Sequence, residues 1–373
     1  MKKTLIFDHE ISGHHIEYLN NLYFHCSKKI NERFVFAMNY NYKTLSADYE
    51  WPNFQNITIY NINDKDLNIL SGGSLKTAFN LCKLLRRVTK EQAVNNILLI
   101  VLIKYIPFLP FFINNKIKVS GIIYNIYLYK WNQYSIFSKS IEFLKYSIIS
   151  NFKVFNKVYI LNDNSSPHVL NKYYRTKKFN FLVDPVIEIN TSSSQITRSN
   201  LSIDSSAYVS IHFGAMNTNK GTLKLLSALS KFSLIDRKKH VFIFAGKISP
   251  EIKKDFYRLI KTLPEVNFII DDKFCTFHEI INYLSISNLI ICPYSRTSQS
   301  SGVIGFSSQF NIPVLVPDQG LLAKLVKRNK LGFVYDGSIN SLKNKILEKR
   351  YMNVSKNYML KNSINNFLQT LVK

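Results

Sequence analysis

Short apolar runs alternate with helical patterns along the first half of the chain. Runs rich in β-branched and aromatic residues predict strands at Thr4–Phe7, Phe34–Met38, Ile57–Ile62, Ile97–Ile103, Val119–Tyr124 and Lys157–Leu161. Apolar residues at helical spacing predict helices at His15–Ser27, Leu75–Val88, Ile136–Ser150 and Ser165–Tyr173. Such alternation is typical of a parallel sheet with helices on both faces.

The second half repeats this alternation more regularly, after an exit strand at Phe179–Val186. Its predicted strands are Tyr208–Phe213, Val241–Ala245, Val266–Ile270, Leu289–Cys292, Pro313–Val316 and Gly332–Tyr335. Its predicted helices are Gly221–Phe232, Glu251–Thr262, Phe277–Ser285, a run ending at Phe310, Leu322–Lys327, a segment after Ser338, and Tyr358–Lys373.

These elements predict an α/β protein of two Rossmann-like, doubly wound domains. We expect an N-terminal domain over residues 1–187, a polar linker over 188–205, a second domain over 206–350, and a C-terminal helix within 351–373 that packs back on the first domain. A ligand cleft is expected between the carboxyl ends of the two sheets.

Composition narrows the function classes. The formal net charge of +25 favours polyanionic or phosphate-bearing partners, and part of the lysine richness is equally explained by genomic bias. No recognised nucleic-acid motif occurs, so we expect no nucleic-acid partner. The four cysteines are far apart in sequence, which indicates reduced, buried thiols in the cytoplasm and neither a disulfide framework nor a metal site.

Two stretches of the sequence bear on whether the protein contacts a membrane. The apolar run from Asn95 to Asn114 contains Lys104, Pro107 and Pro110, so a buried strand followed by a short helix or loop is expected rather than a spanning helix. Its second half, Tyr105–Phe112, is a candidate apolar patch for a lipid interface. The preceding helix carries Lys83, Arg86, Arg87 and Lys90 at near-helical spacing, either as a solvated face or as a contact with the anionic inner face of the cell membrane.

Two loops have the composition of an anion site. Gly214–Gly221 links a strand to a helix and places Lys220 at the helix start, where a diphosphate would sit; a plain capping loop is the alternative. The second loop follows Cys292. Its Tyr294 and Arg296 offer a stacking surface and a cation, and Ser300, Ser301, Gly302 and Val303 offer hydroxyls and N–H groups, the alternative being a serine that caps its own helix. Asp318 is expected to cap the next helix.

Several motifs follow one another in the second half of the chain. They are Gly-x5-Lys-Gly at Gly214–Gly221, a strand ending at Ala245-Gly246, Pro293-Tyr294 followed by Ser300-Ser301-Gly302-Val303-Ile304-Gly305, and the segment from Ile312 to Gly320. Their types and order resemble those of the family-4-like glycosyltransferases of the GT-B fold. The resemblance covers residues from about 208 to 335 and is only topological over the first domain. It implies that Lys220 binds a donor diphosphate, and that Ser300, Ser301, Gly302 and Val303 bind sugar and phosphate.

Three positions depart from that family's pattern. Ala215 stands where an arginine is usual, and Ser298 and Phe306 stand where two glutamates are expected. Donor anchoring must therefore differ, or the activity is lost. Because a branch of the superfamily carries Ser-Ser-Gly-Val here, altered anchoring is the favoured hypothesis.

On the acceptor side, the loop after the first strand carries Glu10, Gly13, His14 and His15. Either histidine can meet an acceptor hydroxyl or a donor phosphate, although capping or packing explains them equally well. The reaction expected is transfer of a sugar from a nucleotide diphosphate to a glycan, with retention of configuration and without a metal or cofactor. A degenerate subunit and a sugar-nucleotide epimerase of the same fold remain alternatives.

Overall fold

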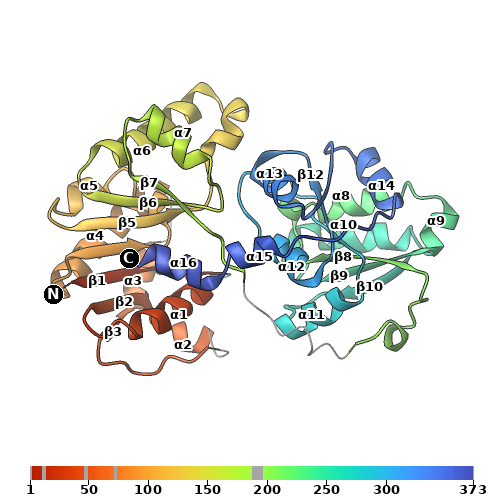
Figure 1. Ribbon diagram of the computed structural model, residues 1–373, viewed down its shortest axis with the longest axis horizontal. Coiled ribbons are helices and arrows are strands. Elements are labelled where there is room, and N and C mark those ends of the chain that lie inside the picture. Colours follow the sequence, from red (N-terminus) through yellow and green to blue (C-terminus); the bar gives the residue numbers. More distant parts are fainter. Residues whose placement is uncertain (1, 11–13, 46–48, 71–73, 187–195, 373) are drawn as a thin grey trace. The chain divides into compact units, whose positions relative to one another are not determined.

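The computed structural model describes residues 2–10, 14–45, 49–70, 74–186 and 196–372 (Figure 1). The chain divides into two compact units, the first comprising Met1–Asp184 and Ile364–Lys373 and the second Pro185–Ser363. Each unit is built on its own parallel sheet. The predicted α/β class with two doubly wound sheets is therefore confirmed.

The sheet of the first unit has the order β3-β2-β1-β4-β5-β6-β7 in the described part of the chain. The strands are β1 (Lys3–Phe7), β2 (Arg33–Asn39), β3 (Ile57–Ile62), β4 (Asn96–Leu99), β5 (Lys118–Ile123), β6 (Phe155–Leu161) and β7 (Phe179–Leu182). Alternate side chains enter two cores: Leu5 and Phe7 face one side of the sheet, and Ile6 faces the other.

Helices cover both faces of this sheet. One face packs against α1 (His14–Ser27) and α16 (Ile364–Leu371). The other face packs against α4 (Ser74–Glu91), η1 (Leu102–Tyr105), α5 (Leu109–Phe112), η2 (Tyr127–Gln133), α6 (Ile136–Asn151) and α7 (Ser166–Tyr173). Two short helices, α2 (Tyr42–Leu45) and α3 (Asp64–Ile69), complete the unit.

The sheet of the second unit has the order β10-β9-β8-β11-β12-β13. Its strands are β8 (Tyr208–Phe213), β9 (His240–Ala245), β10 (Asn267–Asp271), β11 (Leu289–Ile291), β12 (Val314–Pro317) and β13 (Gly332–Tyr335). One face packs against α8 (Thr222–Leu229), α10 (Pro250–Lys261) and α14 (Ile339–Leu347).

The remaining helices of the second unit include two that contact strands directly. Helix α11 (Phe277–Ser285) contacts β8 and β9, and α13 (Gly320–Asn329) contacts β12 and β13. Helix α12 (Val303–Phe310) packs on α15 (Asn357–Lys361). The short elements are η4 (Ser199–Leu201), η5 (Thr218–Lys220) and α9 (Leu234–Lys238).

Three predicted elements differ clearly in their extent. The exit strand expected at Phe179–Val186 ends at Leu182. The strand expected at Ile97–Ile103 ends at Leu99, because the chain turns into the 3-10 helix η1. The single helix expected at Tyr358–Lys373 is two helices, α15 and α16. Between them the carbonyl of Asn362 accepts a 2.7 Å hydrogen bond from the N–H of Val186, so the main chain there bonds to a distant segment instead of continuing the helix.

The apolar run after β4 is mostly core. Tyr105 and Leu109 are buried, and Phe111 is the exposed residue of Tyr105–Phe112. Pro107, Phe108, Pro110 and Phe112 are half-buried, so the apolar surface at this stretch is small, and its contact with lipid stays a prediction. Among the described helices, none combines the length and apolar character that crossing a bilayer requires.

Candidate functional site: an anion loop in one unit and a histidine cluster in the other

Four helices of the second unit begin without a side-chain cap at the carboxyl edge of its sheet. They are α8, α10, α12 and α13, which follow the adjacent strands β8, β9, β11 and β12. By contrast, α11 and α14, which follow the edge strands, are capped by Thr276 and Ser338. First-turn N–H groups without a partner are available to an anion. In α13 the N–H of Leu322 already donates to the carbonyl of Thr297 at 3.1 Å. In α12 those of Ile304 and Gly305 donate to nearby carbonyls, so only the remaining N–H groups are open.

The capping expectations for this edge are corrected by the structure. The residue at the N-cap of α13 is Gln319, and Asp318 instead pairs with Lys327 at 2.5 Å. The residue at the N-cap of α12 is Gly302 and not a serine. The alternative interpretation of the serine-rich loop as a simple helix cap is thereby weakened.

Lys220 lies at the centre of this edge. Its Nζ is 4.1 Å from the ring centroid of Tyr294, a cation–π contact. No carboxylate of the described residues lies within the 4.0 Å ion-pair limit of Lys220, and burial lowers the pKa of its ammonium. The chain has no aspartate or glutamate between residues 280 and 317. A partly desolvated cation in such surroundings is a ready site for an anionic ligand.

The two predicted loops are joined in space. The Lys220 ammonium lies over the Tyr294 ring, and Ser301 opposes the burial that raises the pKa of Tyr294. Ser295 donates through its backbone N–H, at 2.9 Å, to the carbonyl of Asn219. Tyr294 itself is only 5% exposed, so its ring supports Lys220 and does not offer an open stacking face.

Two glycines permit this close approach. A Cβ on Gly221, whose φ is +70°, would lie 2.0 Å from the carbonyl oxygen of Pro293. Gly214 has a φ of +94°, and a Cβ there would meet no atom within 4 Å. Gly221 is thus required for packing of the loops, whereas Gly214 borders open space that a ligand can enter.

The other predicted donor-side residues are accessible. Arg296 is exposed, and Ser300, Ser301, Gly302 and Val303 are partly exposed at the start of α12. Of the two positions where glutamates were expected, Ser298 is buried, and Phe306 packs on Phe213 with ring centroids 5.4 Å apart.

A buried histidine, His212, underlies the Lys220 loop and was not predicted. Its Nδ1 is 2.9 Å from the carbonyl of Ile291, and its Nε2 is 3.0 Å from the hydroxyl of Thr222. The carbonyl requires a proton on Nδ1, so Nε2 accepts from Thr222. Burial lowers the pKa of His212 to about 4, which keeps the ring neutral. A histidine inside an apolar strand was the available sequence signal.

The first unit gathers a cluster of charged side chains after β1. His15 Nδ1 is 2.6 Å from Oδ2 of the buried Asp8, and its Nε2 is 3.4 Å from Oε2 of Glu10. Glu10 also pairs with Lys104. The structure thus brings Glu10 and His15 together, whereas Gly13 and the side chain of His14 lie outside the described residues.

The electrostatics of this cluster favour a charged His15. Burial lowers the pKa of His15, but the hydrogen bond and charge of Asp8, with the charge of Glu10, outweigh burial and raise it. Burial raises the pKa of Glu10, and the contacts with Lys104 and the histidines outweigh that and lower it. Burial lowers the pKa of His9. His15 is therefore a group that can exchange a proton near neutral pH.

Lys104 and Tyr124 complete the cluster, and neither was assigned a role from the sequence. Lys104 was visible only as a charge within an apolar run, which signals a buried or functional partner. The Tyr124 ring stacks on His15 with centroids 6.3 Å apart. Burial raises the pKa of Tyr124, and its hydroxyl has no hydrogen-bond partner within the described structure.

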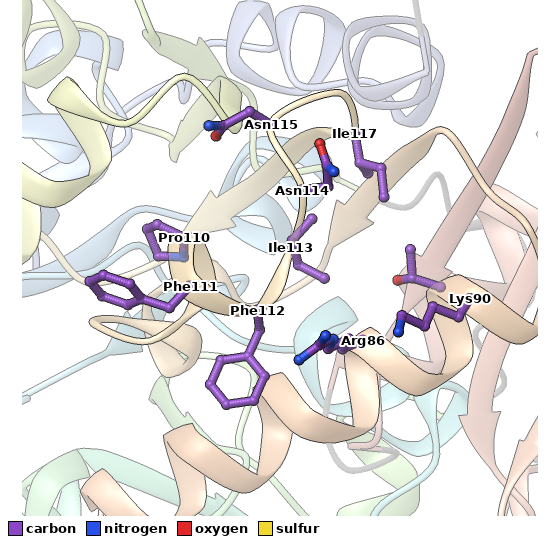
Figure 2. A pocket seen from close by; sticks show the side chains of 10 residues that line it. Arg86, Lys90, Pro110, Phe111, Phe112, Ile113, Asn114, Asn115 and Ile117 are labelled. Carbon is purple, nitrogen blue, oxygen red and sulfur yellow. The ribbon is translucent and has the colours of Figure 1, made fainter.

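A cavity of about 490 Å³ lies elsewhere in the first unit. Arg86 and Lys90 line it from α4, opposite the segment from Pro110 to Ile117 (Figure 2). These residues directly precede β4 and β5, so the cavity is at the amino edge of the sheet, whereas Asp8 follows the carboxyl end of β1. The cavity is therefore separate from the histidine cluster.

Carboxylates near β10 are already paired. Asp272 pairs with Lys253 at 2.6 Å and accepts the N–H of Ile248 at 2.8 Å. No group of three or more metal-ligating side chains is placed to hold an ion within the described ranges. The Asp271-Asp272 pair thus serves local structure.

The sequence matches no protein-family model and no curated protein. Solved structures do match over the whole chain. A glycosyltransferase from Rickettsia africae is 17% identical with a TM-score of 0.66, covering 99% of this chain and 96% of its own. WaaG, a glycosyltransferase of lipopolysaccharide biosynthesis, is 12% identical with a TM-score of 0.67, covering 99% and 98%.

HepE of Anabaena, solved in complex with UDP, is 15% identical with a TM-score of 0.68 and covers 100% of this chain and 97% of its own. The chain has the GT-B fold. At these identities the likeness establishes the fold alone, and the chemistry must be argued from this chain's own residues.

Proposed function

We propose that this GT-B chain is a glycosyltransferase that moves a sugar from a nucleotide-diphosphate donor to a hydroxyl of a glycan carried on a lipid, in bacterial surface polysaccharide synthesis. The observation that carries the proposal is Lys220, a partly desolvated ammonium without a carboxylate partner in the described structure, at the edge where α8, α12 and α13 begin uncapped. Nucleoside diphosphate is the leaving group of such a transfer, and its growing negative charge needs fixed positive dipoles.

On the donor side, we assign the diphosphate to Lys220 and the N-termini of α8 and α12. Gly214 supplies the open space beside that cation. Ser300, Ser301, Gly302 and Val303 would bind sugar hydroxyls or phosphate oxygens through hydroxyl and N–H groups. The HepE structures with UDP and with UDP-glucose support a nucleotide-sugar donor for this fold, and the nucleotide of this chain is left to experiment.

On the acceptor side, we assign His15, oriented by Asp8, to the proton of the acceptor hydroxyl. A hydrogen bond from Nδ1 to a buried carboxylate selects one tautomer and makes the ring more basic. Glu10 and Lys104 position this group and balance its charge. On the basis of the family resemblance, we also propose that the transferred sugar retains its anomeric configuration. We further propose a cytoplasmic enzyme at the inner face of the cell membrane that acts without a metal ion.

The test is a thermal-shift screen of the full chain against UDP-, GDP- and ADP-sugars, followed by assays of donor hydrolysis. We expect at least one nucleotide sugar to raise the melting temperature, and the same donor to be hydrolysed slowly. If none stabilises the protein, the transferase proposal is wrong.

A non-catalytic GT-B subunit is the second candidate. It is favoured by Ser298 and Phe306, which leave the loop without the carboxylates expected of the resembling family. Binding of a nucleotide sugar without hydrolysis or transfer would favour this candidate. An epimerase is a third, because a UDP-N-acetylglucosamine 2-epimerase from Listeria monocytogenes shares the fold with a TM-score of 0.61 at 12% identity. Product analysis distinguishes epimerisation from transfer.

A further inference from the structure

Helix α6 exposes an apolar face that no described element covers. Ile136 and Phe137 are 85% and 74% exposed, and Ile141 and Leu144 are also exposed. At 100° per residue these four lie on one side of the helix, whereas Tyr146 and Ile149 bury the opposite side in the core. A globular helix normally presents polar residues to water, so this face calls for a partner.

The apolar face begins at the edge of the sheet where the histidine cluster lies. Helix α6 follows β5 and runs back toward the start of β6, so its first turn is at the carboxyl edge. Strand β4 alone separates β5 from β1, which places the ends of β1 and β5 about 10 Å apart. Tyr124, the first residue after β5, stacks on His15.

The charges around this face are mainly positive. The segment from Ile126 to Lys153 contains four lysines and one glutamate, and that Glu142 pairs with Lys145 at 2.7 Å. Lys139 Nζ lies 5.2 Å from the ring centroid of Trp131, which is itself 38% exposed. A second copy of the chain would bring lysines against lysines. An anionic lipid surface matches both the charge and the apolar side chains, and tryptophan favours the headgroup level.

We propose that the first turns of α6, with Trp131 of η2, insert into the headgroup region of an anionic membrane and hold the histidine cluster next to a lipid-borne acceptor. This inference rests on the proposed function, and it adds the surface by which the enzyme reaches its substrate. Insertion is interfacial, because Ile136, Phe137, Ile141 and Leu144 can enter the acyl boundary while the lysines remain among phosphates.

Trp131 supplies a direct readout. The chain has two tryptophans, and Trp51 is buried in the core. We expect the emission of the full chain to shift to the blue with phosphatidylglycerol-containing vesicles and to stay unchanged with phosphatidylcholine alone. Trp131→Phe should abolish the shift. An unchanged emission of the parent protein with anionic vesicles overturns the inference.

Co-sedimentation with vesicles measures the strength of membrane binding. Ile136→Ser with Phe137→Ser should weaken partition onto anionic vesicles at least about tenfold, because two exposed apolar side chains lose their insertion energy. Phe274→Ser is the matched control, since Phe274 is 89% exposed in the other unit and should have no effect. Equal binding of the double variant overturns the proposal, as does a parent protein that self-associates through this face and dissociates in the double variant.

Nucleotide-sugar binding without lipid separates this inference from the function on which it rests. The double variant should keep the parent's thermal shift with the donor. If the donor binds and vesicles do not, the membrane surface is wrong and the transferase proposal stands. If vesicles bind and no donor does, the transferase proposal fails while the lipid surface remains.

Discussion

His15 and Asp8 form a 2.6 Å hydrogen bond between Nδ1 and a carboxylate oxygen, although Asp8 directly follows β1 and His15 lies in the first turn of α1. Asp8 is 3% exposed, so its charge acts mainly on the imidazole. This pair is the strongest candidate for proton transfer in the first unit.

Asp8→Asn should lower the transfer rate about tenfold to a hundredfold and move the pH–rate midpoint to lower pH. Burial lowers the pKa of His15, but Asp8 and Glu10 outweigh burial and raise it. The neutral ring is the form that accepts a proton. The parent rate should therefore rise with pH through that raised pKa. Initial rates across pH measure both effects, and Asp255→Asn, at a half-exposed position on α10 in the other unit, is the control.

The same pair should contribute stability with a defined sign. A histidine whose pKa is raised by folding stabilises the native state fully below its unfolded value, near 6.5, and loses that contribution as pH rises through the folded pKa. Asp8→Asn should therefore destabilise the protein more on the acidic side of this window than on the alkaline side. Denaturant unfolding of parent and variant below pH 6.5 and above the raised folded pKa checks this. An equal loss of stability at both pH values would show that the ionic interaction of His15 with Asp8 does not stabilise the fold.

Lys220→Met should weaken nucleotide-sugar binding by about tenfold to a hundredfold, the worth of one charge-assisted hydrogen bond to a phosphate. It should not lower the melting temperature of the free protein, because the ammonium is partly desolvated and has no carboxylate partner in the described structure. Calorimetric titration and thermal melting measure the two effects. Lys238→Met, at an exposed position on α9, is the control. Unchanged affinity of Lys220→Met would exclude Lys220 from the site.

The two loop glycines should behave differently when replaced by alanine. Gly221→Ala places a Cβ against the Pro293 carbonyl and should destabilise the protein by about 1–3 kcal/mol. Gly214→Ala meets no atom, so its stability loss should be smaller, while its methyl group obstructs donor approach. Melting curves and donor titrations of both variants test this. Equal stability losses with equal donor affinities would show that Gly214 does not border the ligand.

His212 should make the second unit sensitive to acid. Burial lowers the pKa of His212 from 6.5 to about 4, so its neutral form stabilises the fold above pH 6.5 and this contribution is lost as pH falls. The loss amounts to about 3 kcal/mol by pH 4, at 1.36 kcal/mol per pKa unit. His212→Asn should flatten the pH dependence of unfolding in this window, and His168→Asn, at an exposed position, should not.

The sequence by itself determined the α/β class and most strands, and it singled out the two loops proposed as an anion site. These follow from local signals: short, mostly apolar runs such as β8, and glycines that end strands. Lys220 and Ser301 were singled out by their place in loops between a strand and a helix, where a cation and hydroxyls favour phosphate binding, and by the family resemblance.

Only the tertiary structure decided which groups act together. Three relationships depend on contacts between residues up to 94 positions apart in the sequence. Asp8 orients His15, Lys104 pairs with Glu10, and Tyr294 supports Lys220. Local propensity carries no information on such contacts. The exposed face of α6 was hidden for the same reason: its apolar residues read as core until the fold showed which side of the helix the sheet covers.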